Sequence, residues 1–213
     1  MLVVRVVPRT RSWPKEMPRL LELFSGTGSV GRVFAAAGWD VYSVDLDPKA
    51  ACSEHCDVLA FEATRWPPGY WDMIWASPPC THYSRARTTA KTPRDLWGSD
   101  ALAQRTLDII AYFQPRAWMI ENPDSGLLKD REVVRGLPYV RTDYCCWGRP
   151  FRKRTRLWTN LTLRLPLCVR EACPSMVGGR HTCTAQRERC SLDELHAIPP
   201  GLVEAVLAAV RSN

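Results

Sequence analysis

The apolar run Met73–Ala76, soon followed by two prolines and a cysteine, constrains the fold more than any other stretch of this chain. Consecutive apolar residues without polar alternation are typical of a short strand buried on both faces of a sheet. The strand cannot continue through Pro78 and Pro79, because proline lacks the backbone N–H that pairing requires. The stretch therefore predicts a core strand that delivers Cys80 to a fixed place where the chain leaves the sheet.

Cys80 has two interpretations on this evidence. A rigid, partly exposed cysteine at the carboxyl end of a strand is a candidate nucleophile. A buried structural cysteine is the more common case when a cysteine is considered alone. Two further segments of the chain favour the nucleophile.

These two segments are predicted strands that also end in residues able to do chemistry. The strand over 19–23 runs into the small-residue turn 24–28, which contains Gly26 and Gly28, and the strand over 117–120 ends in Glu121 and Asn122. A glycine-rich turn between a strand and a helix lets a ligand approach the backbone closely. Each signal is weak when taken alone.

Strands and helices alternate along the rest of this region. The patterns predict strands over 40–44, 137–144 and 156–159, with a covering helix over 101–114. Such alternation predicts an α/β fold with a mostly parallel sheet, whose ligands bind at the carboxyl ends of the strands. Because Asp45, Cys80 and Glu121 each follow a predicted strand, we expect them to share one edge of the sheet.

In this order and spacing, the segments resemble the signature blocks of the C5-cytosine-specific DNA methyltransferase family. The turn that begins at Phe24 is similar to the family's Phe-x-Gly-x-Gly block, Pro79-Cys80 to its Pro-Cys nucleophile, and Glu121-Asn122 to its Glu-Asn dipeptide. The resemblance implies a Rossmann-like fold that depends on S-adenosylmethionine, with DNA as the substrate. The chain looks like a short phage or viral member with a reduced target-recognition region.

The resemblance also implies catalytic roles. The thiolate of Cys80 would add to C6 of a flipped cytosine, and Glu121 would hydrogen-bond at N3. The segment 148–158 is similar to the family's Gln-x-Arg-x-Arg block, although the Gln has no clear counterpart and one residue is inserted. Its arginines would contact the base or its phosphate. The expected catalytic residues are Cys80, Glu121, Arg154, Arg156 and Pro79.

A cofactor site follows from the same resemblance. Asp45 matches the family's acid that binds the ribose of S-adenosylmethionine, and Asp57 matches an acid near the adenine. The expected cofactor-binding residues are Phe24, Ser25, Gly26, Thr27, Gly28, Asp45, Asp57 and Pro78.

A basic segment rich in Ser and Thr follows the candidate nucleophile. Residues 82–94 contain few apolar side chains, and the whole chain has a formal net charge of +7. This composition is typical of a mobile loop able to hold phosphates, with a solvated loop that has no partner as the alternative. The expected nucleic-acid contacts are Ser84, Arg85, Arg87 and Lys91, with Arg152 from a second basic run.

Cysteine and histidine cluster in the arginine-rich, weakly apolar segment 161–197. This composition suggests a zinc knot that replaces a missing core, although the spacing matches no common zinc finger. Free thiols and disulfides are the alternatives. Following similar short members of the family, the preferred ligands are Cys145, Cys168, Cys173 and His181, with Cys146, Cys183 and Cys190 as alternates. A further group, Cys52, His55 and Cys56, is expected to pack on a helix.

The composition changes along the chain predict four parts. These are a lead-in over 1–18, a catalytic region over 19–160, a short recognition-like insertion over 161–197 and a closing amphipathic helix over 198–213 that packs back on the sheet. The chain has no long apolar stretch, and so we expect a soluble intracellular protein without a membrane partner, and a monomer.

Two other functions stay open on the sequence. One is methylation of RNA, or another C5 modification by the same chemistry, since no dedicated RNA module is visible. The other is a non-catalytic zinc and nucleic-acid-binding protein on the same fold. The presence of Cys80, Glu121 and the glycine turn argues against the second alternative.

Overall fold

The computed structural model describes residues 17–88, 90–184 and 190–212. Its centre is a seven-stranded sheet in the order β3-β2-β1-β4-β5-β7-β6. Neighbouring strands from β3 to β5 are parallel, whereas β7 is antiparallel to both β5 and β6. The prediction of a mostly parallel α/β sheet is thus confirmed. The strands are β1 (Arg19–Leu23), β2 (Asp40–Asp45), β3 (Glu54–His55), β4 (Met73–Ala76), β5 (Ala117–Pro123), β6 (Tyr139–Asp143) and β7 (Arg154–Thr159).

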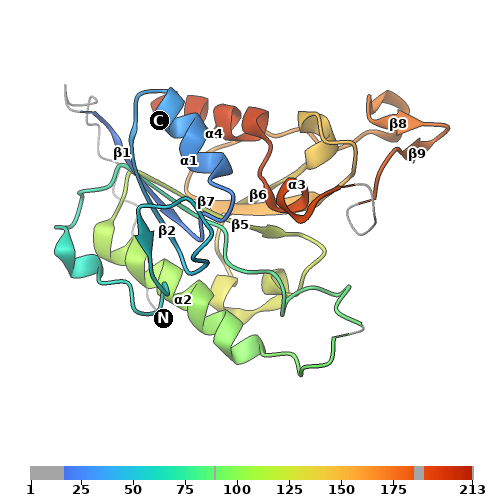
Figure 1. Cartoon of the computed structure of the whole chain (residues 1–213). Coiled ribbons are helices and arrows are strands. Elements are labelled where there is room, and N and C mark those ends of the chain that lie inside the picture. Colours follow the sequence, from blue (N-terminus) through green and yellow to red (C-terminus); the bar gives the residue numbers. More distant parts are fainter. Residues whose placement is uncertain (1–16, 89, 185–189, 213) are drawn as a thin grey trace.

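Helices cover both faces of the sheet, as Figure 1 shows. α2 (Leu96–Phe113) lies along one face, and α1 (Ser29–Ala36) lies beside α4 (Pro200–Ser212) on the other. Phe113 of α2 and Phe34 of α1 belong to two separate buried clusters, one on each side of the sheet. The sheet is therefore the middle of three layers.

The central strand β4 explains why its sequence is a continuous apolar run. All four of its residues are buried. Ile74 and Ala76 face the cluster under α2, whereas Met73 and Trp75 face the cluster under α1 and α4. Because both faces are covered, no position of β4 is available for a polar side chain.

A buried carboxylate joins β1 to α1. Glu22 is 2% exposed, and its Oε2 accepts a hydrogen bond of 3.0 Å from the backbone N–H of Gly31. A Cβ at position 31 would lie 2.5 Å from that oxygen, so the close approach requires glycine. Burial raises the pKa of Glu22 to about 7, even though the N–H groups of Gly31 and Val30 act in the opposite direction.

α2 begins at Leu96, before the predicted start at residue 101. Asp95 caps the helix, because its Oδ1 accepts a hydrogen bond of 2.8 Å from the N–H of Gly98. The first turn carries the exposed Trp97 and the polar residues Ser99 and Asp100, and so the apolar periodicity starts only later in the helix.

The segment around Cys52, His55 and Cys56 is an edge strand and not a helix, contrary to the prediction. Glu54 and His55 form β3, which pairs in parallel with β2. Glu54 is held there because its Oε2 accepts a hydrogen bond of 2.9 Å from the hydroxyl of Tyr42. A strand of two residues is too short to show alternation in the sequence.

Short elements complete the described chain. The expected lead-in over 1–18 lies almost wholly outside the described residues. Across the described ranges, no helix combines the length and the apolar character needed to cross a membrane. The remaining elements are η1 (Ala63–Arg65), η2 (Leu128–Asp130), η3 (Glu132–Val134), η4 (Tyr144–Trp147), η5 (Arg170–Ala172), the two-stranded sheet of β8 (Met176–Val177) and β9 (Arg180–His181), and α3 (Leu192–His196).

Candidate active site

Cys80 follows β4, and Glu121 lies near the carboxyl end of the adjacent parallel strand β5. β4 and β5 are paired so that Ala76 lies opposite Ile120, the residue before Glu121. The buried side chain of Asn122 donates a hydrogen bond of 2.8 Å from Nδ2 to the carbonyl oxygen of Pro78, which ties β5 to the loop that carries Cys80. The two candidate catalytic residues are therefore held at one edge of the sheet, where ligands of such folds bind.

Two hydroxyl groups fix the carboxylate of Glu121. Tyr144, which is fully buried, donates a hydrogen bond of 3.1 Å to Oε1, and the hydroxyl of Thr155 donates to the same oxygen. Within the described part of the chain, Oε2 has no hydrogen-bond partner. The carboxyl group is thus oriented by one oxygen and offers the other.

Cys80 is partly buried, and its surroundings act on its pKa in opposite directions. Burial raises the pKa of the Cys80 thiol, and the nearby carboxylate of Glu121 raises it further. The ammonium group of Lys153 lowers it. Lys153 is itself held over the ring of Tyr144, with its Nζ 4.7 Å from the ring centroid, and donates to the carbonyl oxygen of Leu195 at 3.1 Å.

Arg154 and Arg156, which the resemblance implies contact the base or its phosphate, are each held in the structure by an acidic side chain other than Glu121. Arg154 forms an ion pair with Asp143, with Nη2 and Oδ2 2.8 Å apart. Arg156 pairs with Asp124 at 2.7 Å, and its guanidinium carbon lies 3.9 Å from the ring centroid of Tyr139.

The physical reason is strand alternation in β7. Successive side chains of a strand point to opposite faces. The side chain of Thr155 therefore lies on the opposite face of β7 from those of Arg154 and Arg156. Thr155 reaches Glu121, and Lys153, two residues before it, lies near Cys80. The every-second-residue pattern of a strand separates Thr155 from the two arginines in the sequence, but only the register of β7 against β5 decides which face meets Glu121.

The glycine turn has the open backbone expected of a ligand-binding loop. Phe24 and Gly28 take the positive φ angles of 57° and 64°. The N–H of Gly26 donates to Oδ2 of Asp45 at 2.7 Å, which joins two of the segments expected to bind the cofactor. The buried hydroxyl of Ser25 has no hydrogen-bond partner among the residues that the structure describes.

The other expected cofactor residues lie at the same edge. Asp57 follows β3, and its Oδ1 accepts a hydrogen bond of 2.9 Å from the N–H of Leu59. Thr27 lies in the turn and accepts a hydrogen bond from Arg32 through its carbonyl oxygen. Pro78 is buried in the turn after β4, where its carbonyl oxygen accepts the hydrogen bond from Asn122 of β5.

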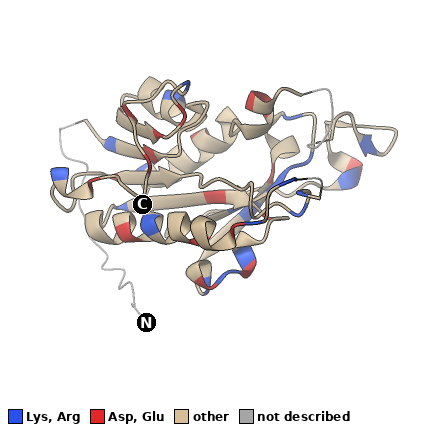
Figure 2. Cartoon of the chain, turned by 60° about the horizontal axis from the view of Figure 1, so that its bottom comes forward, with Lys and Arg blue, Asp and Glu red and all other residues tan. Residues whose placement is uncertain are grey.

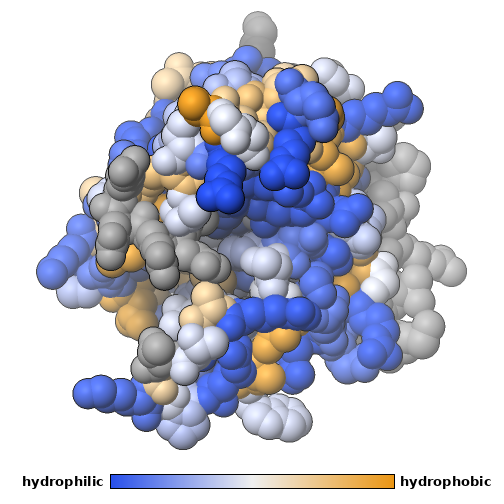
Figure 3. Space-filling model, turned by 90° about the vertical axis from the view of Figure 1, so that its right-hand side faces the viewer, coloured by the Kyte–Doolittle hydropathy of each residue, from blue (hydrophilic) through white to orange (hydrophobic). Residues whose placement is uncertain are grey.

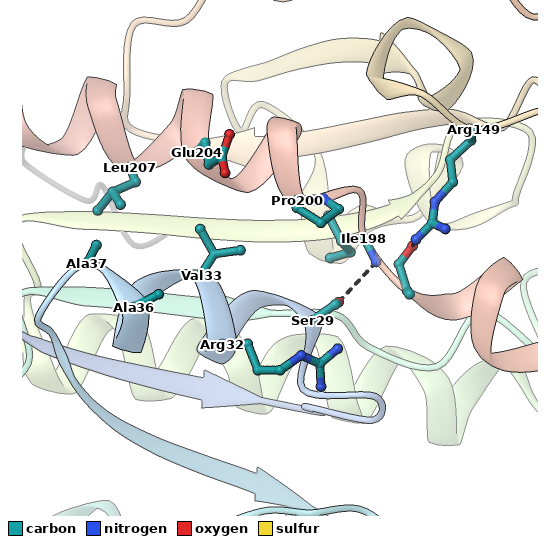
Figure 4. Close-up of a pocket in the computed structure, with 11 residues that line it drawn as sticks. Ser29, Arg32, Val33, Ala36, Ala37, Arg149, Ile198, Pro200, Glu204 and Leu207 are labelled. Carbon is teal, nitrogen blue, oxygen red and sulfur yellow. Dashed lines mark hydrogen bonds between the residues drawn. The ribbon is translucent and has the colours of Figure 1, made fainter.

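A cavity of about 440 Å³ opens beside the glycine turn, between α1 and α4 (Figure 4). Ser29 and Ile198 lie at one end, where Oγ of Ser29 accepts a hydrogen bond of 3.0 Å from the N–H of Ile198, and Arg149 borders the same end. Neither Cys80 nor Glu121 lines this cavity, and so it is not where a base would meet the nucleophile.

The structure brings together the four preferred metal ligands. One donor atom from each residue lies within 4.8 Å of all the others in the set Cys145, Cys168, Cys173 and His181. Nε2 of His181 lies 3.4 Å from Sγ of Cys173 and 3.6 Å from Sγ of Cys168. Three thiols and one imidazole are a donor set that suits zinc.

The alternate cysteines lie elsewhere. The sulfur atoms of Cys183 and Cys190 are 3.4 Å apart and form a separate pair, and Cys146 is not part of the four-residue cluster. Cys52, His55 and Cys56 form no potential metal-binding cluster within the part of the chain that the structure describes, although Sγ of Cys52 lies 3.3 Å from Nδ1 of His55.

Basic side chains surround this side of the molecule. Figure 2 shows Lys and Arg concentrated toward the end of the molecule that carries β8 and β9, and Figure 3 shows hydrophilic side chains around a recess on that side. Arg85 is exposed and lies 3.5 Å from Asp130, whereas Arg87 folds back on Thr92. Lys91 is exposed.

Ser84 and Arg152, two more of the expected nucleic-acid contacts, also have partners within the protein. The hydroxyl of Ser84 accepts a hydrogen bond of 3.2 Å from the N–H of Ala86. Arg152 pairs with Asp143 at 3.0 Å and keeps 46% of its side chain exposed, which leaves it able to meet a phosphate.

Comparison with known proteins places the chain in a family. No family model matches it. A Frog virus 3 (isolate Goorha) protein described as a probable DNA (cytosine-5)-methyltransferase is 39% identical over 175 residues, covering 74% of this chain and 78% of that protein. The chain belongs to the DNA (cytosine-5)-methyltransferase family. The resemblance inferred from its motifs is thereby confirmed.

Solved structures agree with this family fold. A protein described as a DNA modification methyltransferase from an E. coli prophage is 19% identical with a TM-score of 0.51, over 69% of this chain and 49% of that one. The Entamoeba histolytica methyltransferase EhMeth is 14% identical with a TM-score of 0.51, over 72% of this chain and 57% of that one. The chain thus spans about half the length of these structures, and the likeness shows the methyltransferase fold alone.

Proposed function

We propose that this family member transfers a methyl group from S-adenosylmethionine to C5 of cytosine in DNA, through a covalent bond between Cys80 and C6. The observation that carries the proposal is the placement of Cys80 after β4 and of Glu121 near the carboxyl end of the adjacent parallel strand β5, with the ammonium group of Lys153 near the thiol. A nucleophile, a carboxyl group and a cation at one sheet edge are what the addition to cytosine requires.

The reaction begins at the sulfur of Cys80. As a thiolate it adds to C6, and the displaced electron pair moves through the ring toward N3, where Glu121 delivers a proton. Oε2 would be the oxygen that delivers it, because Oε1 already accepts from Tyr144 and Thr155. The positive charge of Lys153 favours the thiolate form of Cys80.

Addition of the thiolate makes C5 a nucleophilic enamine carbon. S-adenosylmethionine, when bound, supplies the methyl group that C5 takes. The proton on N3 returns to Glu121, the proton on C5 is lost to solvent, and its electron pair restores the ring double bond as the thiolate of Cys80 leaves. The bond between Sγ of Cys80 and C6 is therefore formed and broken within one cycle, and the protein is unchanged.

The cofactor would occupy the turn after β1. Its ribose would meet Asp45, and the N–H groups of the turn would face its polar atoms. The unpartnered hydroxyl of Ser25 and the open backbone at Gly26 support this placement. Asp57, at the end of β3, would lie near the adenine.

Zinc would have a structural role. We propose that Cys145, Cys168, Cys173 and His181 bind one ion, which orders a segment with little core of its own. Val169 and Val177 of this segment are 60% and 73% exposed, so apolar burial contributes little to its stability.

DNA would meet the protein on its basic side. C6 of cytosine is inaccessible inside a duplex, and so the base must leave the helix to reach Cys80. Arg85, Lys91 and Arg152 would bind phosphates beside the site, which predicts strongly salt-dependent binding.

The experiment that tests this function measures methyl transfer from labelled S-adenosylmethionine to DNA and to RNA in parallel. We expect label in DNA, at positions that bisulfite sequencing identifies as 5-methylcytosine. Label in RNA alone would replace DNA by RNA as the substrate. Cofactor binding without transfer to either polymer would contradict an enzymatic role.

A further inference from the structure

Trp97, in the first turn of α2, exposes 85% of its surface, more than any other large apolar residue that the structure describes as exposed. Single exposed apolar side chains are common and need no explanation by themselves. The significance of Trp97 comes from two further observations, namely how firmly its helical turn is fixed to the Cys80 segment and how basic its surroundings are.

The turn that carries Trp97 is fastened to the residues just after Cys80. Nδ1 of His82 accepts a hydrogen bond of 2.9 Å from the N–H of Asp95, and the carbonyl oxygen of His82 accepts one from Arg94. The hydroxyl of the buried Tyr83 donates to Oδ1 of Asp100 at 2.9 Å.

A third residue strengthens this connection. The guanidinium group of Arg131 binds both carboxylate oxygens of Asp100, with Nε 3.1 Å from Oδ1 and Nη2 2.6 Å from Oδ2. A bidentate contact of this kind fixes orientation as well as distance. Trp97 therefore stands on a rigid helix end whose position is set by the nucleophile loop.

The surface beside Trp97 suits a polyanion. The segment 84–94 connects the two parts of the chain that these hydrogen bonds join. It carries Arg85, Arg87, Lys91 and Arg94 and no Asp or Glu. An exposed indole that follows a basic segment closely in the chain, with Arg85 and Lys91 of that segment exposed, is a combination with which proteins bind unpaired nucleic acid. The cations follow the phosphates, and the aromatic ring stacks on a base.

We propose that Trp97 stacks on an unpaired base of the substrate strand close to the flipped cytosine. The inference rests on the proposed function, since a base leaves the helix only if the enzyme acts on cytosine. When the cytosine leaves the duplex, the bases next to it lose a stacking partner. Trp97 offers a flat apolar face that replaces it, and being preorganised it loses little entropy on binding.

Binding to two oligomers of equal length and charge tests the proposal without any turnover. One is a fluorescently labelled cytosine-containing single strand, and the other has the same backbone with every base removed. We expect Trp97→Ala to weaken binding of the first about 5- to 100-fold and to leave binding of the second unchanged. Trp97→Phe should retain part of the lost affinity, because phenylalanine keeps a ring.

Lys91→Ala is the matched control for a phosphate contact. It should weaken binding of both oligomers alike and reduce the slope of log K against log salt by about one. Trp97→Ala should leave that slope unchanged, and its melting temperature should equal that of the wild type because the side chain is exposed.

Equal losses on both oligomers for Trp97→Ala, or no loss on either, would overturn the inference. Its outcome is separable from that of the proposed function. Normal methyl transfer with unchanged binding by Trp97→Ala would remove the stacking role alone. Base-dependent binding through Trp97 in a protein that transfers no methyl group would keep the stacking role and remove the enzyme.

Discussion

The hydroxyl of Tyr144 donates a hydrogen bond of 3.1 Å to Oε1 of Glu121, and the next residue in the chain, Cys145, belongs to the Cys/His cluster. Both residues lie in the single turn η4. A metal that holds Cys145 would therefore also hold the hydroxyl that orients the candidate catalytic carboxyl group. The Cys/His cluster and the active site are one connected structure.

Metal content is the first prediction from this relationship. The purified protein should contain about one zinc ion per chain, and Cys173→Ser should release it, because three thiolates and an imidazole complete a tetrahedral site. Hydrogen exchange of residues 144–147 should then become faster, as η4 loses one of its attachments. Cys52→Ser should change neither quantity. Active, folded protein without zinc would contradict this prediction.

Glu22 predicts a pH-dependent stability. Its pKa of about 7 in the folded state is above the ordinary value of 4.5, and so the folded state keeps a proton that the unfolded state loses between these two values. The carboxyl group's contribution is therefore complete below pH 4.5 and is lost as pH rises through 7. By linkage, the free energy of unfolding should fall by about 3 kcal/mol over this window.

Glu22→Gln is the variant that isolates this effect. Glutamine keeps an acceptor for the N–H of Gly31 and does not titrate, so the difference in unfolding free energy between wild type and variant should change across the window. Urea unfolding at several pH values measures it. A difference that stays constant from acid to neutral pH would show that Glu22 is already ionised in the folded protein.

Substitutions of Lys153 and Arg156 test which cation of the segment 148–158 acts on the thiol of Cys80. Lys153→Met should raise the pKa of Cys80, because it removes the cation that lowers it, and should slow turnover about tenfold or more. Arg156→Gln should change the pKa of Cys80 little, since its guanidinium group pairs with Asp124.

The rate at which Cys80 is alkylated, measured by mass spectrometry at several pH values, reports the pKa of its thiol in both variants. The measurement is made at a temperature at which both variants are folded. The expected result is an alkylation curve shifted to higher pH for Lys153→Met alone. A shift of equal size for Arg156→Gln would show that Arg156, and not Lys153 alone, acts on the thiol of Cys80.

The positions of the strands were predictable because each core strand is an apolar run with a chemical residue at its end. β4 and β5 are buried on both faces, and so the sequence itself marks them. Their adjacency then brings Cys80 and Glu121 together, since carboxyl ends of parallel strands meet at one edge.

Which face a side chain takes was not predictable for β7. Its register is set by pairing with β5 across more than thirty residues of chain, and a shift of one residue exchanges the two faces. The sequence alone therefore does not decide whether the arginines of the block or Lys153 and Thr155 approach Glu121 and Cys80. Tyr144 was missed for a similar reason, because nothing local marks its contact with Glu121.

A covalent adduct tests the central claim most directly. DNA that carries 5-fluorocytosine should form a denaturation-resistant complex with the wild type in the presence of S-adenosylmethionine, because fluorine replaces the C5 proton whose loss releases Cys80. Glu121→Gln should reduce adduct formation by orders of magnitude, as the amide cannot protonate N3. The account predicts no adduct with Cys80→Ala, although that variant should still bind S-adenosylmethionine. An adduct of undiminished yield with Cys80→Ala would contradict it.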